Sequence, residues 1–315
     1  MIKIAILDDY QSCAERLADW SRIKAKAELT VFTDSVLDPA RLEARLSPFD
    51  VVCLMRERTP LPRQLLQKLS KLKLIVLTGR RSQTFDIAAA QEMGIKVAFT
   101  GAGPAAHATP ELAIGLILAL ARHIPLGDAM MKRGEWLEHA PLGRVLNGST
   151  LGIIGLGNVG SRVAQFAKLL GMSIKAWSPN LTRDRAEQAG AELAASKEEL
   201  LRAADVISLH LVLAPSTVGT IGERELAQMK PTALLVNTAR GPLVDVSALL
   251  KALSERRIAG AALDVYDLEP LPGDHPLRRL DNVVLTPHFG YVTKEIYEVF
   301  YRETARAVEE YLEAA

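Results

Sequence analysis

A short apolar segment that runs into a glycine turn and then a helix constrains the fold of this chain more than any other feature. Residues 150–160 read TLGIIGLGNVG, and apolar residues recur at helical spacing over the next ten positions. Strand, glycine turn and helix in this order are the fingerprint of a dinucleotide-binding unit. The segment therefore predicts a pyrophosphate site. The alternative is a tight turn between a strand and a helix that binds nothing.

Each glycine of this turn has its own physical reason. Gly155 permits the tight turn, Gly157 lets the backbone approach a pyrophosphate, and Gly160 lets the helix pack closely against the strand. The N-terminus of the helix that follows presents free N–H groups and the positive end of a dipole to phosphates.

Composition excludes several other classes of protein. The chain has 315 residues, which suits two domains, and its net charge of +1 gives no electrostatic reason to bind nucleic acid or an anionic membrane. Cys13 and Cys53 have no metal-ligand spacing, so we expect no metal and two reduced cysteines in a cytoplasmic protein. The opening residues lack the apolar core of a signal peptide, and the most apolar stretch, 112–121, is too short to span a bilayer.

Strand and helix patterns alternate along the chain, which predicts an α/β fold with parallel sheets covered on both faces. The joints GAGP at 101–104 and TPHFG at 286–290 suggest two domains with a cleft between them. The expected helices include 12–24, 110–123 and 294–312, and the stretch 127–149 has no regular pattern. The expected strands are 2–7, 28–32, 51–55, 74–77 and 96–99, then six more at 151–154, 173–177, 206–209, 233–237, 260–263 and 283–285.

Three polar side chains come shortly after separate strands of the second series: Arg240, Glu269 and His288. Ligands of open α/β sheets bind at this edge. Alone, each has an ordinary structural explanation, such as a surface ion pair, a solvated carboxylate or a structural histidine. Together they suit the reduction of a ketone, because a protonated histidine can donate to the carbonyl oxygen while a carboxylate orients its ring.

With these segments the chain resembles the D-isomer-specific 2-hydroxyacid dehydrogenases over nearly its full length. The resemblance implies a Rossmann dinucleotide-binding domain, residues 102–288, inserted in a flavodoxin-like substrate domain made of residues 1–101 and 289–315. It also implies a homodimer joined through helix 110–123 and the stretch 127–149, with Trp136 as a candidate contact. The family's motifs stand here as GLGNVG (155–160), ADVISLHLVLAPSTVGTIG (204–222), MKPTALLVNTARGPLVD (229–245), ALDVYDLEPLP (262–272) and LTPHFG (285–290).

Position by position, the resemblance assigns roles to individual residues. Arg240 matches the arginine that binds the carboxylate and keto oxygen of the substrate, and His288 matches the catalytic histidine, with Glu269 as its acid partner. Asp264 matches the aspartate that contacts the nicotinamide amide. Thr109 and Glu111 match the start of a helix that lines the cofactor. The other positions assigned to the cofactor are Gly155, Gly157, Asn158, Val159, Gly160, Leu211, Thr217, Thr238, Ala239, His288 and Gly290.

The end of the second strand of the dinucleotide domain departs from the pattern of an NAD enzyme. Ser178 stands where such enzymes carry an acidic residue for the ribose 2′-hydroxyl. A neutral residue removes repulsion against a 2′-phosphate, Ser178 and Asn180 can donate hydrogen bonds to it, and Arg183 can supply charge. We therefore favour NADP over NAD. The alternative is that Arg183 only begins a surface helix.

The second departure is in the expected substrate loop, TGRRSQT at residues 78–84. Arg81 and Ser82 fall where the family's backbone N–H groups bind the substrate carboxylate. Two adjacent arginines can also favour a larger or doubly anionic acid, or can simply be solvated.

The predicted activity is the reversible NAD(P)-dependent reduction of a 2-keto acid to a D-2-hydroxy acid, with glyoxylate and hydroxypyruvate as candidate substrates. A second hypothesis is a dinucleotide-sensing binding protein of the co-repressor type, which shares the fold and the Arg/Glu/His set. Formate dehydrogenases also share the fold but keep glutamine where Glu269 stands, so this residue argues against formate oxidation.

Overall fold

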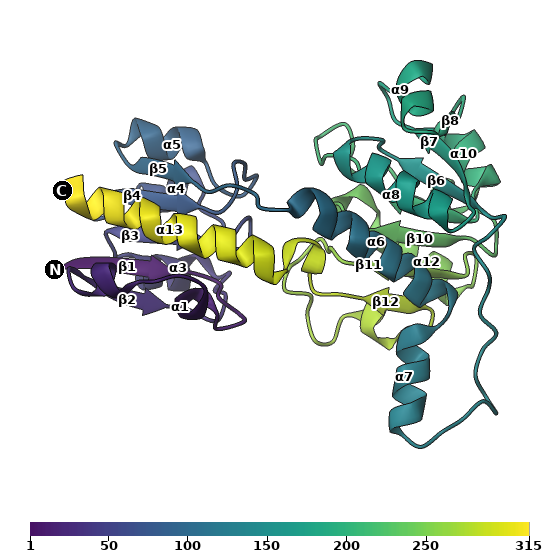
Figure 1. Ribbon diagram of the computed structural model, residues 1–315, viewed down its shortest axis with the longest axis horizontal. Helices are drawn as coiled ribbons and strands as arrows, with labels where there is room; N and C mark the ends of the chain where they lie inside the picture. The colour runs from purple at the N-terminus through teal and green to yellow at the C-terminus, as the bar shows by residue number, and fades with distance from the viewer. Residues whose placement is uncertain (315) are drawn as a thin grey trace. The chain divides into compact units, whose positions relative to one another are not determined.

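The computed structural model describes residues 1–314, and the chain divides into two compact units (Figure 1). Unit 1 comprises Met1–Ala105 together with the segment that begins at Thr293, and unit 2 comprises Ala106–Val292. Each unit is built on its own parallel sheet.

Unit 1 has a five-stranded sheet with the order β2-β1-β3-β4-β5, the flavodoxin-like arrangement that the resemblance implied. Central strands β3 and β4 are buried along their whole length, as expected for strands covered on both faces. Helix α13 (Lys294–Ala314) lies across this sheet and contacts α1, α2 and β4 (Figure 1). The strands are β1 (Ile2–Ile6), β2 (Ala27–Val31), β3 (Val51–Leu54), β4 (Leu74–Leu77) and β5 (Lys96–Phe99), and the other helices are α1 (Ala14–Leu17), α2 (Ser21–Lys24), α3 (Pro39–Leu46), α4 (Arg63–Leu66) and α5 (Ile87–Glu92).

Unit 2 has a seven-stranded parallel sheet with the order β12-β11-β10-β9-β6-β7-β8. The order reverses between β6 and β9, which is the switch point where dinucleotides bind in a Rossmann fold. The strands are β6 (Thr150–Ile154), β7 (Ser173–Trp177), β8 (Glu192–Leu193), β9 (Val206–Leu209), β10 (Leu234–Asn237), β11 (Gly260–Leu263) and β12 (Val283–Leu285). The helices are α6 (Ala105–Ala121), α7 (Ile124–Lys132), α8 (Asn158–Leu169), α9 (Arg183–Gln188), α10 (Lys197–Ala203), α11 (Glu223–Leu226) and α12 (Val246–Ser254), with 3₁₀ turns η1 (Gly241–Leu243), η2 (Pro276–Arg279) and η3 (Phe289–Tyr291).

The predicted helix over 12–24 is wrong as a single element, because α1 and α2 are separate. The indole N–H of Trp20 donates to the carbonyl of Ala14 at 2.9 Å, and Ala18 adopts an extended conformation. The indole thus occupies the carbonyl that the Ala18 amide would bond in a continuous helix.

Three further expectations about unit 2 need correction. The helix predicted to begin at Pro110 begins at Ala105, so Pro110 lies inside α6. The stretch 127–149 is not irregular throughout, because α7 continues to Lys132 after a left-handed residue at His123. The sheet has seven strands rather than six, since the two-residue β8 is too short to give a periodic pattern.

No single helix within 1–314 is long and apolar enough to cross a bilayer, and only α6 and α7 taken together, bent by 64° where they meet, reach that length and composition.

Candidate functional site

The glycine turn between β6 and α8 has the geometry that the sequence predicts. Gly155 has a φ of +103°, and a Cβ there would lie 2.7 Å from the backbone of Leu211. At Gly160 a Cβ would lie 2.2 Å from the carbonyl oxygen of Gly155, so only glycine allows α8 to pack this closely. A Cβ on Gly157 would meet nothing within 4 Å, which leaves its backbone open to a ligand at the N-terminus of α8, where Asn158 and Val159 lie.

His288 and Glu269 form a close pair after the neighbouring strands β12 and β11. His288 Nδ1 lies 2.6 Å from Glu269 Oε2. Glu269 Oε1 accepts a hydrogen bond from the amide of Tyr266 at 2.9 Å, which fixes the second carboxylate oxygen. The side chains of His288 and Glu269 are 26% and 34% exposed, so the pair is accessible to a small molecule.

The electrostatics of this pair keep the carboxylate ionised. Burial acts to raise the pKa of Glu269, but the hydrogen bond and charge of His288, the amide of Tyr266 and the charge of Arg240 together lower it below its usual value. Arg240 is therefore near enough to act on Glu269. The structure thus places Arg240, Glu269 and His288 near one another, and their catalytic roles stay predictions.

Arg240 belongs to a turn that is held by a residue the sequence analysis missed. Asn237 is the buried last residue of β10, and its amide group donates to the carbonyl of Arg240 at 2.8 Å and accepts from the amide of Ala239 at 3.0 Å. The signal in the sequence was an asparagine at the end of an otherwise apolar strand, LLVN.

Asp264 organises the turn that carries His288. Its carboxylate accepts hydrogen bonds from Thr286 Oγ1 at 2.6 Å, the amide of Phe289 at 2.7 Å and the amide of Gly290 at 2.9 Å. Asp264 is fully buried, and this burial raises the pKa of its carboxyl despite the three donors. The direct contact with a nicotinamide that the resemblance implies stays a prediction.

Thr109 also reaches this turn, because its hydroxyl donates to the carbonyl of Gly290 at 2.8 Å. The expectation that Thr109 and Glu111 stand at a helix start is wrong, since α6 begins at Ala105. Thr109 lies in the second turn instead, beside the proline that lacks an N–H for the helix ladder.

The residues of unit 2 fit a dinucleotide on two observations. The glycine turn forms a cradle that a Cβ at Gly155 or Gly160 would disrupt. In addition, Thr238, at the carboxyl end of β10, has a buried hydroxyl oxygen without a hydrogen-bond partner in the described part of the chain. An orphaned buried polar atom at the ligand-binding edge of a sheet is a place where a bound group can supply the missing partner.

Two other candidate cofactor residues lie on the segment after β9. Leu211 is half-buried, directly after His210. The hydroxyl of Thr217 donates to the carbonyl of Val212 and accepts from the amide of Ala214, both at 2.8 Å, so it closes its own loop.

Ser178, Asn180 and Arg183 follow β7 as predicted, but no bonded network connects them. Ser178 is half-buried, while Asn180 and Arg183 are exposed. Thr182 caps α9, so Arg183 is the first residue of that helix, and no ion pair holds it within residues 1–314. Its guanidinium is therefore available to an anion.

In unit 1, Arg81 and Ser82 occupy the loop after β4. Arg81 is exposed, whereas the Ser82 hydroxyl accepts hydrogen bonds from the amides of Thr84 and Phe85 and so shapes the loop. Gly79 opens this loop with a φ of +83°.

Among residues 1–314, no group of three or more His, Cys, Asp or Glu side chains is placed to hold a metal ion.

The chain was compared with known proteins. Residues 114–290 match the family model for the D-isomer specific 2-hydroxyacid dehydrogenase, NAD binding domain. The D-3-phosphoglycerate dehydrogenase of Methanocaldococcus jannaschii is 39% identical over 295 residues, which cover 94% of this chain and 54% of that protein. The glyoxylate reductase of Aeropyrum pernix is 43% identical over 238 residues, covering 73% of this chain and 70% of that protein.

Solved structures give the same result. The crystal structure of a phosphoglycerate oxidoreductase from Vibrio cholerae covers 100% of both chains with a TM-score of 0.92 and 41% identity. The chain spans about half the length of the D-3-phosphoglycerate dehydrogenases it matches. On the family match and these identities, the chain belongs to the D-isomer specific 2-hydroxyacid dehydrogenase family.

Proposed function

We propose that this protein catalyses the reversible reduction of a 2-keto acid to a D-2-hydroxy acid with a nicotinamide dinucleotide. The observation that carries the proposal is the 2.6 Å contact between His288 Nδ1 and Glu269 Oε2, in the same unit as the glycine turn. A dehydrogenase of this kind needs both a dinucleotide site and an acid–base group at a strand end.

The residues have distinct roles in this proposal. When bound, the reduced dinucleotide supplies the hydride. His288 donates a proton to the carbonyl oxygen of the substrate. Glu269 orients the ring and stabilises the positive charge that the ring carries before this transfer. Arg240 binds the substrate carboxylate through its planar guanidinium. In the direction of oxidation, His288 accepts the proton of the alcohol.

Arg81 and Ser82 are proposed to recognise the acid group of the substrate. Exposure of Arg81 supports a substrate with a second negative charge, such as a phosphorylated or dicarboxylic 2-keto acid. The chain is similar to both glyoxylate reductases and D-3-phosphoglycerate dehydrogenases, so small acids and phosphorylated acids are both candidate substrates.

NADP is the proposed cofactor in preference to NAD. A neutral Ser178 supports this choice, and so does Arg183, which makes no ion pair within residues 1–314, because a 2′-phosphate would gain a hydrogen-bond donor and a cation there. We also propose a cytoplasmic location, on the basis of the two unpaired cysteines.

A homodimer is proposed through helix α6 and the stretch 127–149, which includes the end of α7. Seven large apolar side chains between residues 124 and 145 are exposed, among them Trp136 at 62%. Contiguous exposed apolar surface marks association sites, so this exposure supports the proposal. The exposed set is Ile124, Leu126, Met131, Trp136, Leu137, Leu142 and Val145.

The test follows oxidation of NADPH and NADH in parallel with glyoxylate, hydroxypyruvate, pyruvate and a phosphorylated 2-keto acid. We expect turnover with at least one acid, a preference for NADPH, and a loss of at least about a hundredfold in His288→Ala. Tight cofactor binding without turnover on any acid would instead favour the dinucleotide-sensing protein. Light scattering with and without a Trp136→Glu substitution tests the dimer.

A further inference from the structure

Tyr266 bonds to Glu269 through its amide and to the backbone that leads to His288 through its hydroxyl. It follows β11, and its hydroxyl donates toward the carbonyls of Leu263 at 3.0 Å and Thr286 at 2.9 Å. Leu263 ends β11 and pairs in register with Leu285, which ends β12. The hydroxyl therefore joins the ends of the two strands that lead to Glu269 and His288.

The carbonyl that Tyr266 contacts is also bonded by His288 itself. The amide of His288 donates to the carbonyl of Thr286 at 3.1 Å, and His288 adopts the left-handed conformation with a φ of +57°. A non-glycine residue keeps this conformation only where its surroundings hold it. A hydroxyl bound to the same carbonyl contributes to that hold.

The backbone of Tyr266 acts on the other half of the pair and on the arginine turn. Its amide donates to Glu269 Oε1 at 2.9 Å. A Cβ placed on Gly241 would lie 2.1 Å from the carbonyl carbon of Tyr266, so the two backbones touch directly after Arg240. Tyr266 is thus adjacent to all three segments that carry the proposed site.

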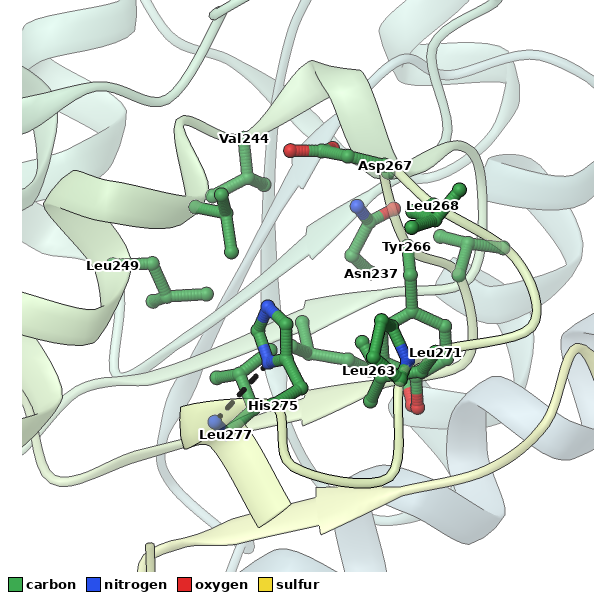
Figure 2. Close-up of a pocket in the computed structure, with 14 residues that line it drawn as sticks. Asn237, Val244, Leu249, Leu263, Tyr266, Asp267, Leu268, Leu271, His275 and Leu277 are labelled. Carbon is green, nitrogen blue, oxygen red and sulfur yellow. Dashed lines mark hydrogen bonds between the residues drawn. The ribbon is translucent and has the colours of Figure 1, made fainter. Parts of the chain in front are cut away.

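The loop that carries Tyr266 borders a pocket. The pocket has a volume of about 100 Å³, and Figure 2 shows Tyr266 among the residues around it. The cavity is lined mainly by apolar residues, among them Val244, Leu249, Leu263, Leu268, Leu271 and Leu277.

We propose that Tyr266 is a positioning residue. Its hydroxyl holds the turn that carries His288, so that Nδ1 of His288 stays in contact with Glu269 while the ring exchanges a proton with the substrate. This inference rests on the proposed function for its catalytic meaning, but the geometry it describes belongs to the free protein. Burial raises the pKa of the Tyr266 hydroxyl, which keeps it a hydrogen-bond donor at neutral pH.

The decisive variant is Tyr266→Phe, which keeps the ring and the amide and removes only the hydroxyl. Tyr311→Phe is the matched control, because the Tyr311 hydroxyl has no hydrogen bond within residues 1–314 and its ring contacts Lys96 in unit 1. Thermal unfolding of both variants checks that each one folds.

The first readout uses histidine labelled with ¹⁵N in the protein without cofactor or substrate. The resonance of His288 Nδ1 is assigned by its disappearance in His288→Asn. We expect the Nδ1 proton to exchange with water about two- to tenfold faster in Tyr266→Phe than in the wild type, the change expected from one lost hydrogen bond. Tyr311→Phe should match the wild type. Equal exchange in Tyr266→Phe and the wild type would overturn the proposal.

The second readout separates this inference from the proposed function. If the wild type reduces a 2-keto acid, kcat of Tyr266→Phe should fall by about two- to tenfold while the dissociation constant of the cofactor stays unchanged. An unchanged kcat would overturn the positioning role and leave the proposed function standing. If the wild type reduces no 2-keto acid, faster exchange in Tyr266→Phe still supports the structural link between Tyr266 and His288.

Discussion

His288 Nδ1 lies 2.6 Å from Glu269 Oε2 although the two residues are 19 positions apart in the sequence. Because the carboxylate occupies Nδ1, the other ring nitrogen, Nε2, is the one left to exchange a proton with a ligand. The contact therefore sets both the orientation of the ring and the atom that acts.

Glu269→Gln should slow ketone reduction. Glutamine keeps a polar partner of similar size at His288 Nδ1 but removes the negative charge, and hydrogen bonds to charged groups are the stronger ones. We expect kcat to fall by at least about tenfold while the dissociation constant of the cofactor stays unchanged. Steady-state rates with saturating cofactor measure the loss, and an unchanged kcat would contradict the pairing.

The same carboxylate should affect stability in acid. The pKa of Glu269 in the folded protein lies below its usual value of 4.5, so ionisation stabilises the fold at higher pH. This contribution is complete above about pH 4.5 and is lost as the pH falls through the folded pKa. Thermal unfolding should therefore show a difference between wild type and Glu269→Gln that shrinks in acid. A difference independent of pH would contradict this prediction.

Gly157 and Gly160 should respond differently to alanine. A Cβ added at Gly157 has free space around it. A Cβ added at Gly160 would lie 2.2 Å from the carbonyl oxygen of Gly155. We expect Gly160→Ala to destabilise the protein by about 1–3 kcal/mol. The free energy of unfolding of Gly157→Ala should lie within about 0.5 kcal/mol of that of the wild type.

Gly157→Ala should weaken cofactor binding although it leaves stability almost unchanged. Its methyl group would stand where the backbone approaches the pyrophosphate, so Gly157→Ala should weaken binding of NADPH or NADH by at least about tenfold. Fluorescence titration measures this loss. Unchanged affinity would mean that the dinucleotide lies elsewhere.

Asp264→Asn should destabilise the turn of His288. One oxygen of Asp264 accepts from Thr286 and Phe289 and the other accepts from Gly290, so an amide NH₂ would face at least one donor. A buried donor left without an acceptor costs about 1–3 kcal/mol. Denaturant unfolding measures the loss. Asp267→Asn is the control, because that carboxylate is exposed and makes no hydrogen bond within residues 1–314; equal effects of the two substitutions would contradict the prediction.

Ser178→Asp should change the choice of cofactor. A carboxylate after β7 repels a 2′-phosphate and accepts from a free 2′-hydroxyl. We expect the ratio of kcat/KM with NADPH to kcat/KM with NADH to fall by at least about tenfold, because hydrogen bonds to charged groups are strong enough to give this change. A constant ratio would show that Ser178 does not contact the ribose.

Local features of the sequence predicted the fold and the framework of the site. The glycines of 155–160 and the apolar strands depend on residues only a few positions away, so β6, α8 and the parallel α/β class follow from the pattern, whereas the arrangement of the two domains came from the resemblance. The same pattern placed Arg240, Glu269 and His288 at one edge of the sheet. Motif resemblance supplied their pairing.

Contacts that span long separations were beyond the sequence. The Tyr266 hydroxyl reaches a carbonyl 20 residues away, and no periodicity marks a tyrosine for that role. The break between α1 and α2 has a different reason, because the indole of Trp20 bonds a carbonyl only six residues earlier. Helix propensity does not encode such a side-chain bond to the backbone, which competes with the helix ladder.

Helix α13 completes unit 1 with residues that are translated after the whole of unit 2. Tyr297, Phe300 and Tyr301 are buried in unit 1, whose strands are translated before the whole of unit 2. The face of the sheet that α13 covers therefore stays uncovered, with its apolar side chains exposed to solvent, while unit 2 is translated. Nascent chains of this protein should bind chaperones at that face, and their affinity should drop once α13 has emerged.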